Sequence, residues 1–161
     1  MVRIRLKILE TQRDVKMLSQ TYAANVEQIR SLYPDAEFVA VMRDKPLCKY
    51  SYREYSLVPS KKLIAEYNKS QQTKDDWEQF ALKFSEEMKL HVPSVAILRI
   101  AKRAQSKDVF LVGHEDPGCG ERCHRFLLLN LIDDVAKENG FEIKIRRILF
   151  KLSENLLLSI R

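Results

Sequence analysis

The residue types best suited to chemistry are concentrated in residues 114–125. These twelve residues contain two cysteines, two histidines, two arginines and three acidic side chains. Cys123 stands directly between Arg122 and His124, and a cysteine beside cationic groups at a helix start has a stabilised thiolate. We interpret Cys123 as a candidate activated thiol, with Glu115 and His124 as the groups that orient or buffer it.

The same segment allows a structural alternative and a sharper chemical one. In the structural alternative, Cys123 packs as a small hydrophobe under the helix and Arg125 pairs with Glu115. Cys119 and Arg125 have the spacing Cys, five residues, Arg that phosphatase loops show. In such loops a thiolate attacks phosphorus while the arginine holds the phosphate oxygens. The match is partial, because Phe126 stands where those enzymes carry a Ser or Thr that assists the leaving thiolate.

Metal binding and disulfide formation are two further alternatives for this segment. Four side chains have the chemistry of zinc ligands, although their spacing matches no standard finger or ribbon; they are His114, Cys119, Cys123 and His124. A reversible disulfide between Cys119 and Cys123 fits their separation, but redox pairs of the thioredoxin kind use a two-residue spacer. We assign no metal ligand and no cofactor from the sequence.

A second candidate region is the basic, tyrosine-rich stretch 43–62. Its six cationic residues face only two acidic ones, and three tyrosines lie among them. Because cationic side chains bind phosphates and aromatic rings stack on bases, this mixture suits a nucleotide or a single-stranded nucleic acid. The ordinary alternative is a loop of solvated lysines and packing tyrosines. The residues in question are Arg43, Lys45, Lys49, Tyr50, Tyr52, Arg53, Tyr55, Lys61 and Lys62.

Two predicted strands bring these regions together. Residues 38–42 and 109–112 are continuous apolar runs, as expected of parallel strands covered on both faces. If the two strands are neighbours, both candidate regions leave the same carboxyl edge of the sheet, where open α/β sheets bind ligands and helix N-termini attract anions. We therefore expect an anionic ligand, a phosphorylated small molecule or a nucleic acid, at this edge. The residues assigned to binding it are Arg43, Tyr52, Arg122 and Arg125.

The remaining elements follow from periodicity and capping signals. Residues 2–8 alternate as an edge strand does, and apolar spacing after Thr11 predicts a helix over 11–33. A short helix is expected after Pro59, another after the capping box of Thr73 and Asp76, and a third up to Gln105. The last two elements are a helix over 124–139, closed by Gly140, and a strand over 141–145 with a bulge at Arg146–Arg147.

The alternation of strands and helices predicts the fold class. It favours an α/β, three-layer Rossmann-like sandwich with a mostly parallel central sheet and alternating edge strands. The 161 residues suit a single α/β domain over 1–161, large enough for a core without disulfides or metals.

Composition limits the function classes. The formal net charge is +6, no apolar run approaches the length of a membrane span, and the Met-Val-Arg-Ile-Arg start has no hydrophobic signal core. Three cysteines suggest a reducing compartment. We expect a cytoplasmic protein without a membrane partner. A non-catalytic nucleic-acid-binding module is kept as a further alternative, and the oligomeric state is not predicted.

Several motifs occur in an order that resembles a known family. A strand ending in Val-Gly-His-Glu-Asp-Pro precedes Cys123-His124-Arg125, which opens an apolar helix. Upstream lie the segment 41–46, then Tyr52 and Tyr55, and then the Asp-Trp-Glu-Gln-Phe helix at 76–80. Over about residues 36–140 this arrangement resembles family 488 of the domains of unknown function, and the Cys-His-Arg step is its most specific element.

The resemblance implies a compact Rossmann-like α/β domain with no established reaction. One departure is Val41, which stands where the family tends to carry an Asp two residues before the first arginine. Cys119 is not part of the shared signature, which weighs against the phosphatase interpretation. The shared residues would map onto Arg43, Glu115, Cys123, His124 and Arg125.

Overall fold

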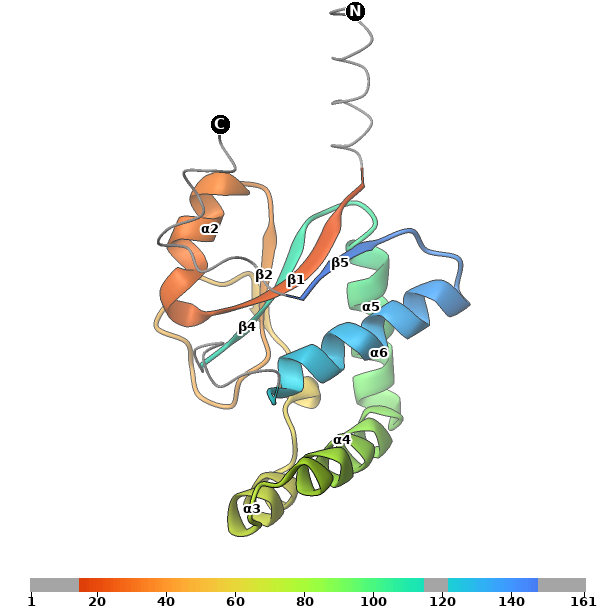
Figure 1. The fold of residues 1–161 in the computed structure, drawn as a ribbon. Helices are drawn as coiled ribbons and strands as arrows, with labels where there is room; N and C mark the ends of the chain where they lie inside the picture. The colour runs from red at the N-terminus through yellow and green to blue at the C-terminus, as the bar shows by residue number, and fades with distance from the viewer. Residues whose placement is uncertain (1–14, 115–121, 148–161) are drawn as a thin grey trace, which may run out of the picture.

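A five-stranded parallel sheet forms the centre of the molecule (Figure 1). The computed structural model describes residues 15–114 and 122–147. The strand order in the described residues is β3-β2-β4-β1-β5, and all four pairings between neighbours are parallel. The strands are β1 (Met17–Tyr22), β2 (Glu37–Ala40), β3 (Tyr52–Arg53), β4 (Val109–Gly113) and β5 (Lys144–Arg146). This confirms the predicted α/β class with a parallel central sheet.

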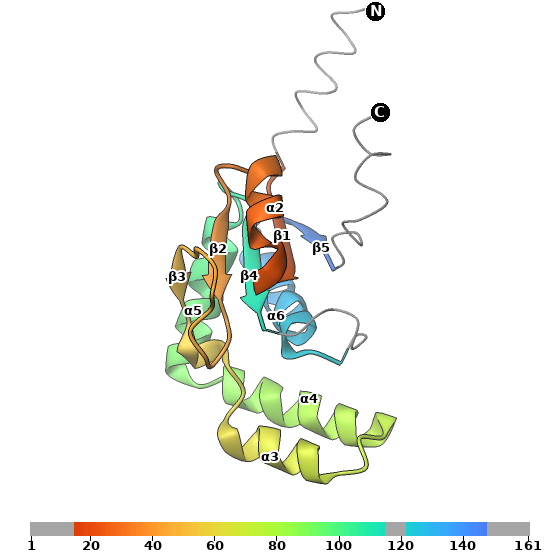
Figure 2. The same cartoon turned by 90° about the vertical axis from the view of Figure 1, so that its left-hand side faces the viewer.

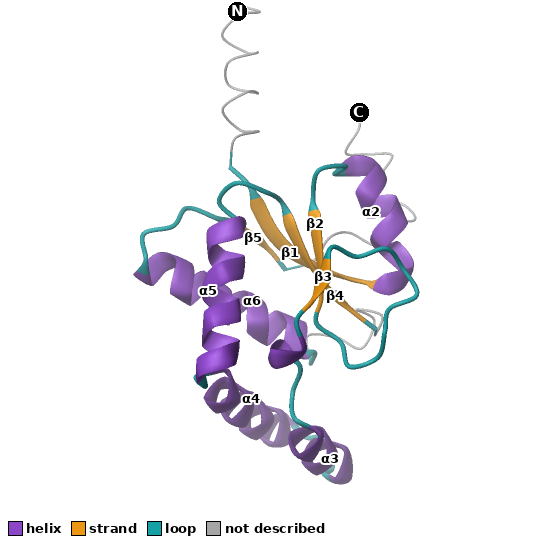
Figure 3. Ribbon diagram, turned by 180° about the vertical axis from the view of Figure 1, so that it is seen from behind, coloured by secondary structure: helices purple, strands orange, loops and turns teal. Residues whose placement is uncertain are grey.

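Helices cover both faces of the sheet, as Figures 1 and 3 show. On one face, α5 and α6 cover the larger core, which includes Leu18, Val39 and Leu111 from the strands. On the other face, α2 covers a smaller core around Phe38 and Phe110. The helices are α2 (Val26–Leu32), α3 (Lys61–Lys69), α4 (Lys74–Met88), α5 (His91–Arg103) and α6 (His124–Glu138), with 3-10 turns η1 (Ala23–Asn25) and η2 (Tyr55–Leu57).

The two strands predicted to carry the candidate regions are neighbours. β2 pairs with β4 in parallel over four residues, from Glu37 opposite Val109 to Ala40 opposite Val112. All residues of both strands are buried, which explains why both read as continuous runs in the sequence. The prediction that the segments after these strands leave the same edge of the sheet is confirmed.

The first described strand corrects the sequence analysis. Residues 17–22 were expected in a long helix, but they form β1, which pairs with β4 and β5. The three-and-four spacing of Leu18 and Tyr22 is real, yet Ser19 is also buried and donates its hydroxyl to the carbonyl of Arg146 at 2.6 Å. The polar residues of this strand gave its sequence the pattern of an amphipathic helix. The long-range hydrogen bonds that allow such residues to be buried leave no trace in the local sequence.

The stretch after β2 contains more structure than a loop. Tyr52–Arg53 form the edge strand β3, and η2 follows before α3 begins with Ser60 as its N-cap. The expected short helix after Pro59 is confirmed in α3. The expected strand at 2–8, the helix start at Thr11 and the residues beyond Arg147 that the bulge would involve lie outside the described residues.

Helices α3 and α4 form a hairpin beyond the carboxyl ends of β2 and β4 (Figure 2). The capping box of Thr73 and Asp76 is present as predicted, with Asp76 N donating to Thr73 Oγ1 at 3.2 Å and Thr73 N donating to Asp76 Oδ2 at 2.9 Å. Leu63 is the buried residue of α3, whereas α4 buries Phe80, Phe84 and Met88. All four side chains belong to the larger core, so both helices join the hairpin to the body of the molecule and α4 contributes more of the buried side chains.

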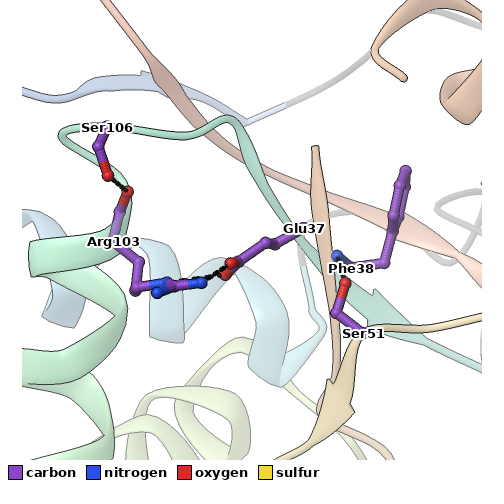
Figure 4. A network of polar contacts seen from close by, with 5 residues as sticks. All are labelled: Glu37, Phe38, Ser51, Arg103 and Ser106. Atoms are coloured by element: carbon purple, nitrogen blue, oxygen red, sulfur yellow. Dashed lines mark hydrogen bonds and ion pairs between the residues drawn. The ribbon is translucent and has the colours of Figure 1, made fainter. Parts of the chain in front are cut away.

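The amino end of β2 is fixed by polar contacts (Figure 4). Arg103, at the end of α5, forms an ion pair with the buried carboxylate of Glu37. Phe38 N donates to Ser51 Oγ at 2.9 Å, which holds the segment before β3 against β2. These contacts lie at the end of β2 opposite to the candidate site. None of the described helices has the length and apolar character needed to cross a bilayer.

Candidate functional site

A pocket of about 610 Å³ lies at the carboxyl edge of the sheet. One wall comes from the residues that follow β2 and β4 and from the first turn of α6; the other comes from the α3–α4 hairpin. A volume of this size is typical of small-molecule sites. The predicted site residues in its wall are Arg43, Arg122, Cys123, His124 and Arg125.

Cys123 and Arg125 form the centre of the sheet-side wall. Cys123 is the N-cap of α6 and is 5% exposed, whereas Arg125 is fully buried. Arg125 Nε donates to Cys123 Sγ at 3.2 Å, and Arg125 Nη1 donates to the carbonyl of Thr21 near the end of β1. The side chain of Arg125 thus brings a guanidinium group against the thiol and ties the helix start to the sheet.

Gly113 makes room for this arginine. It is the last residue of β4, and a Cβ built on it would lie 2.6 Å from Arg125 Nε and 2.7 Å from Arg125 Cδ. Contacts this short do not occur with real side chains, so any larger residue would displace the guanidinium group. No local sequence signal marks Gly113 as a site residue, and only the packing reveals its role.

His124 links three elements at the same wall. Its Nε2 lies 2.8 Å from the carbonyl oxygen of Val41, just after β2, and its ring makes an edge contact with Phe84 of α4 at a centroid distance of 6.0 Å. Since a carbonyl can only accept, we assign the proton to Nε2. Burial lowers the pKa of His124 to about 4, with a smaller opposing effect from the Val41 hydrogen bond and a further lowering by Arg125.

This pKa separates the two roles expected for His124. An imidazole with a pKa near 4 is neutral at physiological pH and exchanges few protons there. The low pKa therefore favours an orienting role for His124 over a buffering role. The cationic group beside the thiol is the guanidinium of Arg125.

Arg43 and Arg122 connect the two walls. Arg43 Nη2 donates to the carbonyl of Pro59, just before α3, at 2.6 Å. Arg122 Nη1 donates to the carbonyl of Gln72, in the α3–α4 turn, at 2.5 Å. Gln72 has a φ of 53°, an uncommon conformation for a residue with a side chain. Both arginines are exposed and line the pocket.

The hairpin wall is mainly aromatic. Tyr67 of α3 and Trp77 of α4 meet edge to face at 5.6 Å, and Trp77 stacks on Phe80 at 5.0 Å. All three line the pocket. Tyr67 and Trp77 are only partly buried, so they pack against the core and still contribute to the pocket surface.

Tyr52, predicted to bind ligand, does not line this pocket. Its half-buried side chain packs against the larger core, and its buried hydroxyl has no hydrogen-bond partner among the described residues. Burial, and then the carboxylates of Glu37 and Glu54, raise its pKa. Tyr55 is 57% exposed and stacks under Arg53 outside the pocket. The aromatic component of the pocket thus comes from the hairpin and not from the loop predicted to provide it.

Glu115, Cys119 and Cys48 do not contribute to the described wall of the pocket. Glu115 and Cys119 lie outside the described residues, as does one end of the disulfide considered between Cys119 and Cys123. Within residues 15–114 and 122–147, no three His, Cys, Asp or Glu side chains are grouped so that they could hold a metal ion. Cys48 is a free thiol packed against the smaller core, on the α2 face of the sheet.

The aromatic wall was not predicted from the sequence, for an identifiable reason. Trp77 and Phe80 lie on one face of a predicted helix, which ordinarily indicates core. The useful signal was the pair of adjacent helices starting at Ser60 and Thr73, because a short turn between them implies an antiparallel hairpin whose aromatic residues meet. That those rings also face a pocket depends on the placement of the hairpin.

One comparison with known proteins gives a match. The model DUF488-N3a, described as the active DUF488-N3 subclade, matches residues 17–136. This stretch is well over half of the chain and contains every residue that lines the pocket. No curated protein and no solved structure gives a significant match.

Proposed function

The chain belongs to the DUF488 family of domains of unknown function, and from that premise we propose that its pocket binds an anionic ligand next to a reactive thiol at Cys123. The anionic group, such as a phosphate, contacts Arg43, which follows β2, and Arg122, which lies just before the N-cap of α6. The observation that carries this proposal is the convergence of three arginines and a cysteine on one pocket.

Charge favours an anion in this pocket. Arg43, Arg122 and Arg125 line it, against Asp44 as the acidic side chain in the described wall. The first turn of α6 lies in the same wall, and the N-terminus of a fifteen-residue helix adds a partial positive charge. Arg43 and Arg122 each keep further N–H donors beyond the one bonded to a backbone carbonyl.

The surroundings of Cys123 suit a reactive thiol. A guanidinium donor directed at sulfur, together with a helix start, is the type of environment in which thiolates are stabilised. Cys123 Sγ has this donor at 3.2 Å. The family description of this subclade as active agrees with a reacting group, although it names no reaction.

Alkylation of the full-length protein tests both halves of the proposal. We expect iodoacetamide to modify Cys123 faster at neutral pH than Cys48, because Arg125 Nε donates to Cys123 Sγ, whereas burial raises the pKa of Cys48. Sodium phosphate should slow modification of Cys123, and sodium chloride at equal ionic strength should not. Cys48, on the opposite face of the sheet, is the internal control and should show no protection.

Variants identify the anion contacts and the alternative chemistry. Arg122→Gln should reduce the phosphate protection of Cys123. Modification of Cys123 by iodoacetamide no faster than that of Cys48 would contradict the reactive thiol, and equal protection of Cys123 and Cys48 would contradict the anion site. If an aryl phosphate is hydrolysed and only Cys119→Ser abolishes the hydrolysis, the phosphatase alternative is favoured instead.

A further inference from the structure

The hairpin wall of the pocket has an aromatic surface that the anion proposal does not use. Tyr67 of α3 and Trp77 of α4 join the two helices through a ring contact, which explains part of their burial. Both nevertheless remain only partly buried, and both line the pocket. Aromatic surface left open to a cavity is costly in water and is typical of a binding surface.

The cationic and aromatic surfaces belong to opposite walls of one pocket. Arg122 follows the sheet, whereas Trp77 lies on the hairpin, and the Arg122–Gln72 and Arg43–Pro59 hydrogen bonds hold the two walls together. A ligand lying between the walls can therefore contact guanidinium groups on one side and aromatic side chains on the other. The volume of about 610 Å³ admits a ring together with its anionic substituent.

We infer that the ligand is a planar aromatic ring joined to an anionic group, with the ring on Trp77 and Tyr67 and the anionic group on Arg43 and Arg122. This inference rests on the proposed function and extends it to a substrate class. A nucleoside monophosphate and an aryl phosphate share this chemistry. Stacking on aromatic side chains does not depend on the identity of a base, because every base has a π face.

The single tryptophan of the chain makes the inference directly measurable. Trp77 is the only tryptophan in the sequence, so its fluorescence reports on the hairpin wall. We expect adenosine 5′-monophosphate and phenyl phosphate to change this fluorescence and to bind at least about tenfold more tightly than ribose 5-phosphate, since only the first two contain a ring that stacks. The tighter of the two ring-containing ligands identifies the source of the ring.

Variants measured by titration calorimetry provide the controls. Trp77→Ala should weaken adenosine 5′-monophosphate about tenfold and leave ribose 5-phosphate unchanged, whereas Trp77→Phe should keep most of the affinity. Trp77→Phe also guards against misfolding of the alanine variant. Tyr55→Ala is the matched control, because Tyr55 is an exposed ring beside an arginine but lies outside the pocket.

The outcomes separate this inference from the proposed function. If ribose 5-phosphate and adenosine 5′-monophosphate bind equally well and Arg122→Gln weakens both, the anion site holds and the aromatic inference is overturned. If adenosine binds as tightly as its monophosphate and Arg122→Gln has no effect, the proposed anion site fails, and the inference fails with it. Absence of binding by all of these probes overturns both.

Discussion

The two walls of the pocket differ in the sequence distance that their contacts span. On the hairpin, Thr73 caps α4 through Asp76, three residues away, and Ser60 caps α3 through Leu63 in the same manner. On the sheet side, Arg125 reaches Thr21 across 104 positions. The helix caps of the hairpin wall thus depend on contacts between residues close in the sequence. The Arg125 contact of the sheet wall exists only in the folded chain. We expect substitutions in the sheet wall to lower the stability of the whole molecule, and substitutions in the hairpin to have local effects.

Replacing Arg125 should have the largest effect. Arg125→Leu leaves the carbonyl of Thr21 and the sulfur of Cys123 without their donor in a buried environment, and each buried group left without its partner costs about 1–3 kcal/mol. Urea unfolding should show this loss. Arg125→Lys keeps the charge but not the forked donors, and should fall between the wild type and Arg125→Leu. A loss below about 1 kcal/mol for Arg125→Leu would show that the sheet wall does not depend on this residue.

Gly113→Ala should have the next largest effect. Its Cβ would lie 2.6 Å from Arg125 Nε, so the buried side chain must move, and overpacking of this kind costs about 1–3 kcal/mol. The change should also alter the alkylation rate of Cys123. Gly140→Ala is the control: with a φ of +69° and no atom of the described residues within 4 Å, it should lose about 1 kcal/mol through backbone strain and leave Cys123 unaffected. If Cys123 is alkylated at the same rate in both variants, Gly113 does not influence the environment of the thiol.

The pH dependence of stability should reveal His124. Its folded pKa of about 4 lies below the ordinary value of 6.5, so the unfolded chain takes up a proton at a higher pH than the folded one does. The stability that depends on the neutral imidazole is therefore complete about one pH unit above 6.5 and is lost as pH falls toward 4, by about 2 kcal/mol between about pH 7.5 and 5.

A glutamine at this position isolates the effect. His124→Gln keeps a donor for the carbonyl of Val41 but cannot titrate, so the unfolding free energy should change less between pH 6.5 and 5 than in the wild type. His91→Gln, at an exposed position outside the pocket, should leave the wild-type slope intact. A slope that is the same in wild type and His124→Gln would contradict a depressed pKa for this imidazole.

The hairpin cap should have the smallest effect. Thr73→Ala removes the hydroxyl that accepts from Asp76 N, and loss of an N-cap costs about 1 kcal/mol. Thermal unfolding should detect this loss, whereas Thr73→Ser should restore most of it. Because the cap is exposed and local, the alkylation rate of Cys123 should not change. A change in that rate would mean that the two walls are coupled more closely than their contacts suggest.

The same contrast explains which elements the sequence could predict. β2, β4, α4 and α6 follow from apolar runs, capping residues and Gly140, all of which are local signals. β1 was missed because Ser19, Gln20 and Thr21 are buried in a strand through contacts with distant segments, Ser19 and Gln20 donating to backbone carbonyls of Arg146 and Arg147. Tertiary contacts of this kind override local patterns.

The site was predictable to a similar extent. That the segments with Arg43 and Cys123 meet at one edge follows from parallel strands whose carboxyl ends lie together. The donor that reaches Cys123 and the neutral state of His124 depend on packing around buried side chains, which no spacing encodes. The contribution of Trp77 depends on where the hairpin lies, and no local rule determines that position.

The strand order also has a consequence for how the chain folds. β1 and β2 come first in the sequence, but they do not pair with each other; β4 lies between them and pairs with both. A sheet of this order cannot close until the chain up to Gly113 is available, and closing such long loops is a slow step. During synthesis, β1 and β2 would therefore wait for the same central partner, β4, which is also the strand that ends at the pocket.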